Sequence, residues 1–300
     1  MAHWLVRIIV LMMIFNPAPL GAEAEGSDLL VRLRSSRVEE SSVVPGSEIA
    51  QVELLFARGL DQPMSAGTLR AWEEHGFVTE SIRLQGDPCH LLFEKADARL
   101  GRGMFLLCPT RSQGSILLIP HGFHDRFTAE IGALLAEEGR FRAVAWNTTP
   151  RQPTEDDESE RVNQDAEIEI ENYFTGLARA VSVLGLPGPM IQLHGFAPYL
   201  RSTEAGRRAR AILSSGSNDP HQSTLDVASC LEHELGDRLL VYPTEVSELG
   251  GTQSQIAAVL RAWGRRDFLH LELSFALRKK LLEDSDTRRS LIDCVEGESR

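Results

Sequence analysis

Two histidines follow apolar runs and are themselves followed by glycine. His121 comes directly after SILLIP (115–120), and His194 ends MIQLH (190–194). Imidazole is a common ligand of zinc, and the ends of neighbouring parallel strands meet at one edge of a sheet. The glycines at 122 and 195 let the backbone turn sharply and let a substrate approach. The two strand ends therefore predict two ligands of one metal site.

A third ligand is available near His121. His124 gives an H-x-x-H spacing and Asp125 an H-x-x-x-D spacing, and either can put a second donor atom on the same side of a turn. Three protein ligands with one open position are typical of a catalytic zinc site. Histidine and aspartate also accept Mn, Fe or Co, so the residues predict one bound metal ion, with Zn²⁺ expected, and leave its identity open.

Glu272 stands in the middle of the apolar run FLHLELS (268–274). A carboxylate among apolar neighbours costs free energy unless it is paired or used, and a glutamate beside a metal-bound water is the usual general base of metal-assisted hydrolysis. Glu272 is therefore the predicted catalytic residue. The alternative is a structural ion pair between Glu272 and Arg278 of the following segment.

Three arginines follow closely on predicted strand ends: Arg126, Arg151 and Arg201. The planar guanidinium group can bind both oxygens of a carboxylate. As a set, these arginines favour a substrate that carries a carboxylate over a neutral ester.

These residues need a scaffold that brings strand ends together. From Ser115 onward, short apolar runs alternate with amphipathic segments, which predicts an α/β fold with a mostly parallel or mixed central sheet and helices on both faces. The predicted strands are 115–120, 142–148, 190–194, 210–215, 239–243 and 268–274. The predicted helices are 127–138, 173–184, 223–235, 252–263 and 275–283.

The chain divides into three predicted parts. Residues 1–24 carry Arg7, an apolar run from Ile8 to Phe15 and small residues near Ala24, which predicts a signal peptide. Residues 25–111 contain three strand-like runs and are expected to form antiparallel edge strands packed on the main domain. Residues 112–300 form the predicted α/β catalytic region, interrupted by an acidic stretch at 154–171 that is expected to be a solvated loop.

Charge and cysteine content restrict location and partners. The formal net charge of −12 argues against nucleic acid or an anionic membrane as a partner, which leaves a small or peptide-like substrate. The four cysteines are an even number, and Cys89 and Cys108 flank a predicted hairpin, which suggests a bridge between them. A secreted or periplasmic protein without stable membrane anchoring after signal cleavage is expected.

The motifs together resemble a known group of zinc hydrolases. PHGFHDRFTAEI, the strand-end LHG, and ELS followed by Arg278 look like the group that contains N-formylglutamate amidohydrolases and phage-type poly-γ-glutamate hydrolases, which are similar in turn to the zinc carboxypeptidase fold. The poly-γ-glutamate enzymes have a Thr-x-Glu-Ile segment that opens a helix. Aligning Thr128 to that segment puts Asp125 on the acidic metal ligand, with aspartate where glutamate is usual.

The resemblance implies a zinc-activated water that attacks an amide carbonyl, with Glu272 passing the proton to the leaving amine. It leaves the scissile bond open among peptide, γ-glutamyl and N-acyl amino acid linkages. Two other classes compete. The first class is an α/β-type serine hydrolase, which needs a G-x-S-x-G pentapeptide. The chain has no such pentapeptide, since LSSGSN around Ser215 lacks the first glycine. The second class is an exported, non-catalytic binding protein on the same fold. A measurement of metal content would distinguish it from the enzyme.

Overall fold

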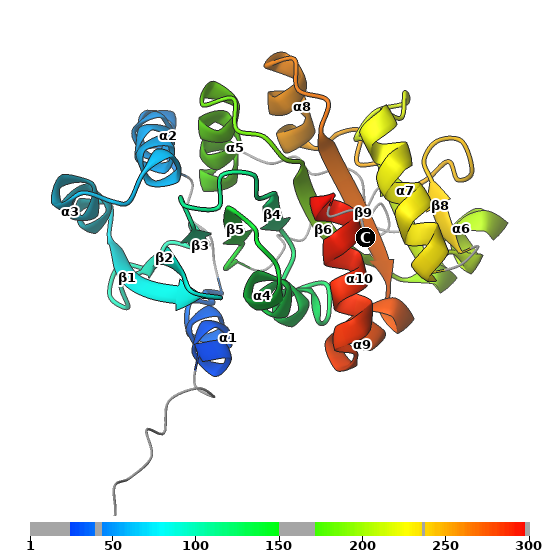
Figure 1. Ribbon diagram of the computed structural model, residues 1–300, viewed down its shortest axis with the longest axis horizontal. Helices are drawn as coiled ribbons and strands as arrows, with labels where there is room; N and C mark the ends of the chain where they lie inside the picture. Colours follow the sequence, from blue (N-terminus) through cyan, green and yellow to red (C-terminus); the bar gives the residue numbers. More distant parts are fainter. Residues whose placement is uncertain (1–24, 40–43, 150–171, 236–237, 298–300) are drawn as a thin grey trace, which may run out of the picture.

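A computed structural model describes residues 25–39, 44–149, 172–235 and 238–297. These residues form one nine-stranded sheet in the order β1-β2-β3-β5-β4-β6-β9-β7-β8 (Figure 1). The strands are β1 Phe77–Leu84, β2 Asp87–Glu94, β3 Met104–Leu107, β4 Ile116–Ile119, β5 Ala143–Trp146, β6 Met190–Phe196, β7 Ala211–Ser214, β8 Leu239–Val241 and β9 Phe268–Ser274. The predicted α/β class is confirmed.

The sheet is mixed. The pairs β4/β5, β4/β6, β6/β9 and β7/β8 are parallel. The pairs β1/β2, β2/β3, β3/β5 and β7/β9 are antiparallel. Because β3 pairs directly with β5, the N-terminal strands extend the same sheet that contains β4, β6 and β9.

Helices cover both faces of this sheet (Figure 1). They are α1 Glu25–Ser35, α2 Gly46–Asp61, α3 Ala66–Glu74, α4 Thr128–Glu138, α5 Tyr173–Val183, α6 Glu204–Arg208, α7 Gln222–Leu235, α8 Gln255–Ala262, α9 Phe275–Glu283 and α10 Ser285–Glu296, with a 3₁₀ turn η2 at Pro198–Leu200. Within the described ranges, no helix is long and apolar enough to cross a membrane.

The alternation of side chains along the strands explains the two layers. In β4, Leu117 and Ile119 belong to the hydrophobic cluster that includes residues of α1, α4, α7, α9 and α10. Ile116 and Leu118 belong to the cluster that includes residues of α2, α5 and α8. All four side chains of β4 are buried, which is why the strand reads as a continuous apolar run. The polar side chains of β6 and β9 lie on the face of the sheet that packs toward α5 and α8.

The connections reverse direction at β4. From β4 the chain passes through α4 to β5 on one side, and then returns through α5 to β6 on the other side. The crevice between the carboxyl ends of β4 and β6 is therefore a topological switch point, where ligands bind in open α/β sheets. His121 and His194 belong to these two strand ends.

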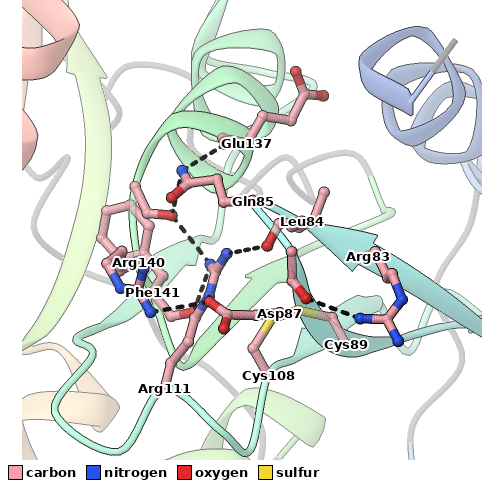
Figure 2. A network of polar contacts seen from close by, with 12 residues as sticks. Arg83, Leu84, Gln85, Asp87, Cys89, Cys108, Arg111, Glu137, Arg140 and Phe141 are labelled. Carbon is pink, nitrogen blue, oxygen red and sulfur yellow. Dashed lines mark hydrogen bonds and ion pairs between the residues drawn. A yellow bond between two sulfur atoms is a disulfide. The ribbon is translucent and has the colours of Figure 1, made fainter. Parts of the chain in front are cut away.

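A buried arginine ties the N-terminal hairpin to the α4–β5 turn (Figure 2). The guanidinium group of Arg111 donates to the carbonyl oxygens of Leu84 at 2.9 Å, Gly139 at 3.1 Å and Phe141 at 3.3 Å, and its Nε donates to Asp87 Oδ2 at 3.0 Å. These bonds fix β1 and β2 against the segment that leads into β5.

Two disulfides reinforce the fold. The predicted bridge between Cys89 and Cys108 is present and joins β2 to the end of β3, beside the Arg111 network (Figure 2). Cys230 of α7 is bonded to Cys294 of α10. Three sequence predictions lie outside the described residues: the signal peptide at 1–24, the acidic stretch at 154–171 and Arg151.

Candidate active site

A tight turn after β4 places His121 and Asp125. The carbonyl oxygen of His121 accepts from the amides of His124 at 2.9 Å and Asp125 at 2.8 Å. The carbonyl oxygen of Asp125 accepts in turn from the amide of Thr128 at 3.0 Å and from its hydroxyl at 2.7 Å, which starts α4. Phe127 caps the helix with a φ of 77°, a left-handed conformation that is uncommon for an aromatic residue. The turn is therefore held by hydrogen bonds on both sides.

His194 and Glu272 are neighbours across two parallel strands. The register of β6 and β9 pairs His194 with Glu272, so the two side chains lie on the same face of the sheet. His194 is 5% exposed and Glu272 is 4% exposed. The Oε2 atom of Glu272 is buried and has no hydrogen-bond partner among the described residues. A buried carboxylate oxygen in this state fits a site that a ligand completes.

The turn and the strand ends bring the predicted ligands together. The ring centroids of His121 and His194 are 5.1 Å apart, and Asp125 Oδ2 lies 3.9 Å from His194 Nδ1. The amide of Gly195 donates to Asp125 Oδ2 at 2.8 Å, which orients the carboxylate toward β6. His124, the alternative ligand, has an exposed side chain. The geometry favours Asp125 over His124.

Charge accumulates around this cluster. Burial raises the pKa of Asp125, the neighbouring His121 opposes that shift, and the charge of Glu272 adds to it. Burial also lowers the pKa of Arg278, against the attraction of Asp125 and Glu272. Two desolvated carboxylates therefore share one neighbouring guanidinium group, and a bound cation would stabilise their ionised forms.

Arg278 is positioned by the backbone. It donates to the carbonyl oxygens of Arg126 at 2.9 Å and Phe196 at 3.4 Å. A Cβ at residue 195 would lie 2.1 Å from Arg278 Nη1, so glycine leaves the space that the guanidinium group occupies. Among the described residues, the alternative of a direct Glu272–Arg278 ion pair is not found, although the charge of Glu272 acts on Arg278. The basic side chain within ion-pair distance of Glu272 Oε1 is His270, whose Nε2 lies 3.3 Å away and which is charged only when protonated.

Sequence reasoning missed His270. Its ring is buried and its centroid lies 4.6 Å from that of His194. The signal was available, because His270 and Glu272 alternate with leucines in FLHLELS and must therefore share a face.

The predicted substrate-binding arginines differ in their surroundings. Arg126 is exposed, with its guanidinium carbon 4.8 Å from the ring centroid of Phe127 and 5.6 Å from that of Phe275. The rings of Phe127 and Phe275 are stacked, 5.6 Å apart. Arg201 is buried, and its Nη1 lies 3.8 Å from Glu248 Oε2, so its charge is already engaged. Arg126 is therefore the arginine presented to solvent beside the cluster.

The residues fit a metal ion by type, although the described part of the chain contains no preassembled group of three His, Cys, Asp or Glu ligands. Two imidazoles and a carboxylate are a usual zinc donor set. Two atoms bound to one tetrahedral zinc at about 2.1 Å are about 3.4 Å apart. The measured 3.9 Å between Asp125 Oδ2 and His194 Nδ1 is slightly longer.

The serine-hydrolase alternative finds no support at Ser215. Its hydroxyl is hydrogen-bonded to Ser217 Oγ at 3.0 Å and to the carbonyl oxygen of Asp219 at 3.2 Å. Neither partner is a base that could activate the hydroxyl group.

No protein-family model matches this chain, and no curated protein sequence matches it. Among solved structures, the LapA aminopeptidase of Legionella pneumophila is similar with a TM-score of 0.38 at 8% identity, covering 91% of this chain and 70% of that one. An aspartoacylase family protein from Mesorhizobium loti has a TM-score of 0.36 at 13% identity, covering 73% and 66%. A protein from Shewanella denitrificans OS-217 assigned as a carboxypeptidase A has a TM-score of 0.37 at 10% identity, covering 82% and 67%. TM-scores below 0.5 are too low to transfer an activity to this chain.

Proposed function

We propose that this protein is a metal-dependent hydrolase of amide or peptide bonds, with zinc as the expected metal. The observation that carries the proposal is the convergence of His121, Asp125 and His194 at the β4/β6 switch point with Glu272 beside them. Metal ligands next to a buried carboxylate are the parts that metal-assisted hydrolysis requires.

Each residue has a role in this proposal. His121, His194 and Asp125 hold the metal, and the amide of Gly195 orients the Asp125 carboxylate. The metal would activate a water molecule and polarise the scissile carbonyl group. Glu272 accepts the proton of the attacking water and returns it to the leaving amine. Burial of Glu272 keeps bulk water from competing for that proton.

The proposed substrate carries a carboxylate. Arg126 lies on the rings of Phe127 and Phe275, and both residues adjoin the site: Phe127 on the His121 turn and Phe275 directly after β9. Stacking on aromatic rings limits the rotamers of an arginine before a ligand arrives, which lowers the entropy cost of binding. Peptides with a free C-terminus, N-acyl amino acids and γ-glutamyl compounds all present the required group.

We also infer that the protein is exported. The signal-peptide pattern at 1–24 and the presence of two disulfides support this location, because disulfides persist in oxidising compartments.

The activity is tested with amides that carry a free carboxylate, assayed with and without a chelator. We expect hydrolysis that the chelator abolishes and added zinc restores, and we expect none from His121→Ala or His194→Ala. Tight binding of such compounds without turnover, unaffected by the chelator, would favour the binding-protein alternative instead.

A further inference from the structure

Four polar residues lie together on the face of β6 and β9 that packs toward α5 and α8. The strand register pairs Gln192 with His270 and His194 with Glu272, so all four side chains leave the sheet on one side. All four are buried, with Gln192 at 0% exposure. Burial of so many polar groups between apolar layers costs free energy unless they bond to one another. His194 and Glu272 belong to the proposed site, whereas Gln192 and His270 have no role in it yet.

The ring of His270 is held from several sides. Its Nδ1 lies 3.5 Å from Gln192 Oε1, and its Nε2 lies 3.3 Å from Glu272 Oε1. Its face is tilted against His194, with ring centroids 4.6 Å apart. Gly251, at a φ of 59°, closes the remaining side, because a Cβ there would lie 2.6 Å from Cγ of His270. The ring therefore has little freedom to rotate.

Gln192 is fixed in turn by the start of α8. Its Oε1 accepts a hydrogen bond from Ser254 Oγ at 3.1 Å. Ser254 is the N-cap residue of α8, and its hydroxyl also accepts from the amide of Ala257 at 3.4 Å. A continuous chain of contacts thus runs from the helix N-terminus through Gln192 and His270 to the carboxylate of Glu272.

We propose that His270 is a positioning residue for Glu272, and that Gln192 and Ser254 hold His270 in place for this task. The inference rests on the proposed function, in which Glu272 transfers the proton. Gln192 Oε1 and Glu272 Oε1 can both only accept, so His270 bonds to both when each ring nitrogen carries a hydrogen, with Nδ1–H facing Gln192 and Nε2–H facing the carboxylate. This fixes the direction of Glu272 Oε1, while Oε2 stays available for the reacting water.

The kinetic test compares His270→Leu and His270→Gln with Glu272→Gln. We expect His270→Leu to lower kcat about 10–100-fold, as second-layer partners of a metal site do, with KM within about threefold and metal content unchanged. His270→Gln should recover part of the loss, because its amide can still donate to Glu272. His90→Leu, which removes a partly buried histidine of β2 far along the sheet from β9, is the matched control and should have wild-type kcat.

The outcomes separate the two claims. If Glu272→Gln retains full activity, the proposed function fails. If Glu272→Gln is inactive and His270→Leu has wild-type kcat, the positioning role of His270 is overturned and the proposed function stands. Loss of the metal in both His270 variants would also overturn it, because His270 would then serve the metal centre.

A second readout needs neither activity nor metal. The metal-free protein is labelled with ¹⁵N-histidine, and the ring signals that are lost in His270→Gln are assigned to His270. We expect this ring to carry hydrogen on Nδ1. Gln192→Leu and Ser254→Ala should shift the signals of that ring. A His270 ring without hydrogen on Nδ1, or one that neither substitution affects, would contradict the chain of contacts.

Discussion

Glu272 lies between two leucines of its strand, His194 follows Leu193, and both are buried. Stability alone does not explain them, since apolar residues of similar volume are tolerated in such positions and avoid the cost of desolvation. Their neighbours Asp125 and Arg278 add a second carboxylate and a cation whose pKa values are both shifted by burial. A cluster of this kind is typical of a functional site.

Glu272→Gln tests the role of the carboxylate. The substitution keeps the size of the side chain but removes its capacity to accept a proton, so we expect kcat to fall by about 10²–10⁴-fold with metal content unchanged. Steady-state kinetics and elemental analysis of the same preparation measure both quantities. Glu283→Gln, at an exposed residue of α9, is the matched control and should have wild-type kcat.

Arg126→Met tests substrate recognition. Methionine keeps apolar contact with Phe127 and Phe275 but loses the charge, so we expect kcat/KM to fall about tenfold or more for substrates with a free carboxylate. The same substrates with a carboxamide in place of the carboxylate should be affected little. Arg208→Met, at an exposed position of α6, should change neither value. An equal loss on both substrate forms would contradict carboxylate recognition by Arg126.

Residue types predicted the candidate site better than spacing did. The strand-end pattern of His121 and His194 was sufficient to predict their proximity, because the register of parallel strands dictates it. Spacing could not decide between His124 and Asp125, since the direction of each side chain depends on hydrogen bonds within the turn. The alternative of a Glu272–Arg278 ion pair rested on their nearness in sequence, whereas the guanidinium group reaches across Gly195 to the carbonyl oxygens of Arg126 and Phe196.

At the scale of elements, hydrogen-bonded charged groups stabilise connections that follow strands. Partly buried Glu248 is one example: it accepts hydrogen bonds from the amide and hydroxyl of both Ser202 and Thr203, after η2. Arg111 is a second example, because it bonds to Leu84, Asp87, Gly139 and Phe141 at the junction of the hairpin and the α4–β5 turn (Figure 2). Both networks hold connections that follow strands, which is where the fold needs additional support.

Arg111→Met tests the junction between the hairpin and the α4–β5 turn. The variant removes the Arg111 donors of three carbonyl oxygens and of Asp87, although Gly139 and Asp87 keep bonds from Gln85 and Arg140. We expect the free energy of unfolding to fall by about 3 kcal/mol. Urea unfolding followed by circular dichroism measures this change. Arg83→Met, which removes an exposed arginine of the same hairpin, should lie within about 0.5 kcal/mol of the wild type. Equal effects of the two variants would be inconsistent with the junction described here.

Glu248→Gln tests the network after η2 through its pH dependence. Burial alone would raise the pKa of Glu248, but hydrogen bonds from Thr203 and Ser202 outweigh it and lower the pKa below its ordinary value of 4.5. The ionised form therefore stabilises the folded state above that value, and this stability is lost as pH falls through the lowered pKa. Between about pH 5 and about pH 3, the wild type should lose stability more steeply than Glu248→Gln. Exposed Glu204→Gln should follow the wild-type slope.

Strands were easier to predict than helices. All six strands predicted after Ser115 are present, because each is a short apolar run buried on both faces. The helices α1, α2, α6 and α10 were not predicted. The sequence of α10, SDTRRSLIDCVE, is largely polar, and its apolar residues are buried only because α7 and α9 pack against it and Cys294 is bonded to Cys230. This packing and this disulfide are tertiary contacts, which a local sequence pattern does not contain.

At the scale of the whole molecule, one sheet connects all of these features. The antiparallel strands β1–β3 extend it on one side, β7 and β8 extend it on the other, and the switch point between β4 and β6 lies between the two extensions. Each side carries one disulfide, Cys89–Cys108 and Cys230–Cys294. The scaffold thereby holds the strand ends that carry His121, His194 and Glu272 in a fixed relation, which is what a catalytic site requires.

The most direct test of the proposed metal centre is the metal content of the chain from about residue 25, purified without chelators and reconstituted with zinc. We expect about one zinc ion per chain, lost in His121→Ala, Asp125→Ala and His194→Ala and retained in His124→Ala. Retention in Asp125→Ala with loss in His124→Ala would instead assign the third ligand to His124. A wild-type chain that binds no stoichiometric metal after reconstitution would contradict the account of this protein as a metal-dependent hydrolase.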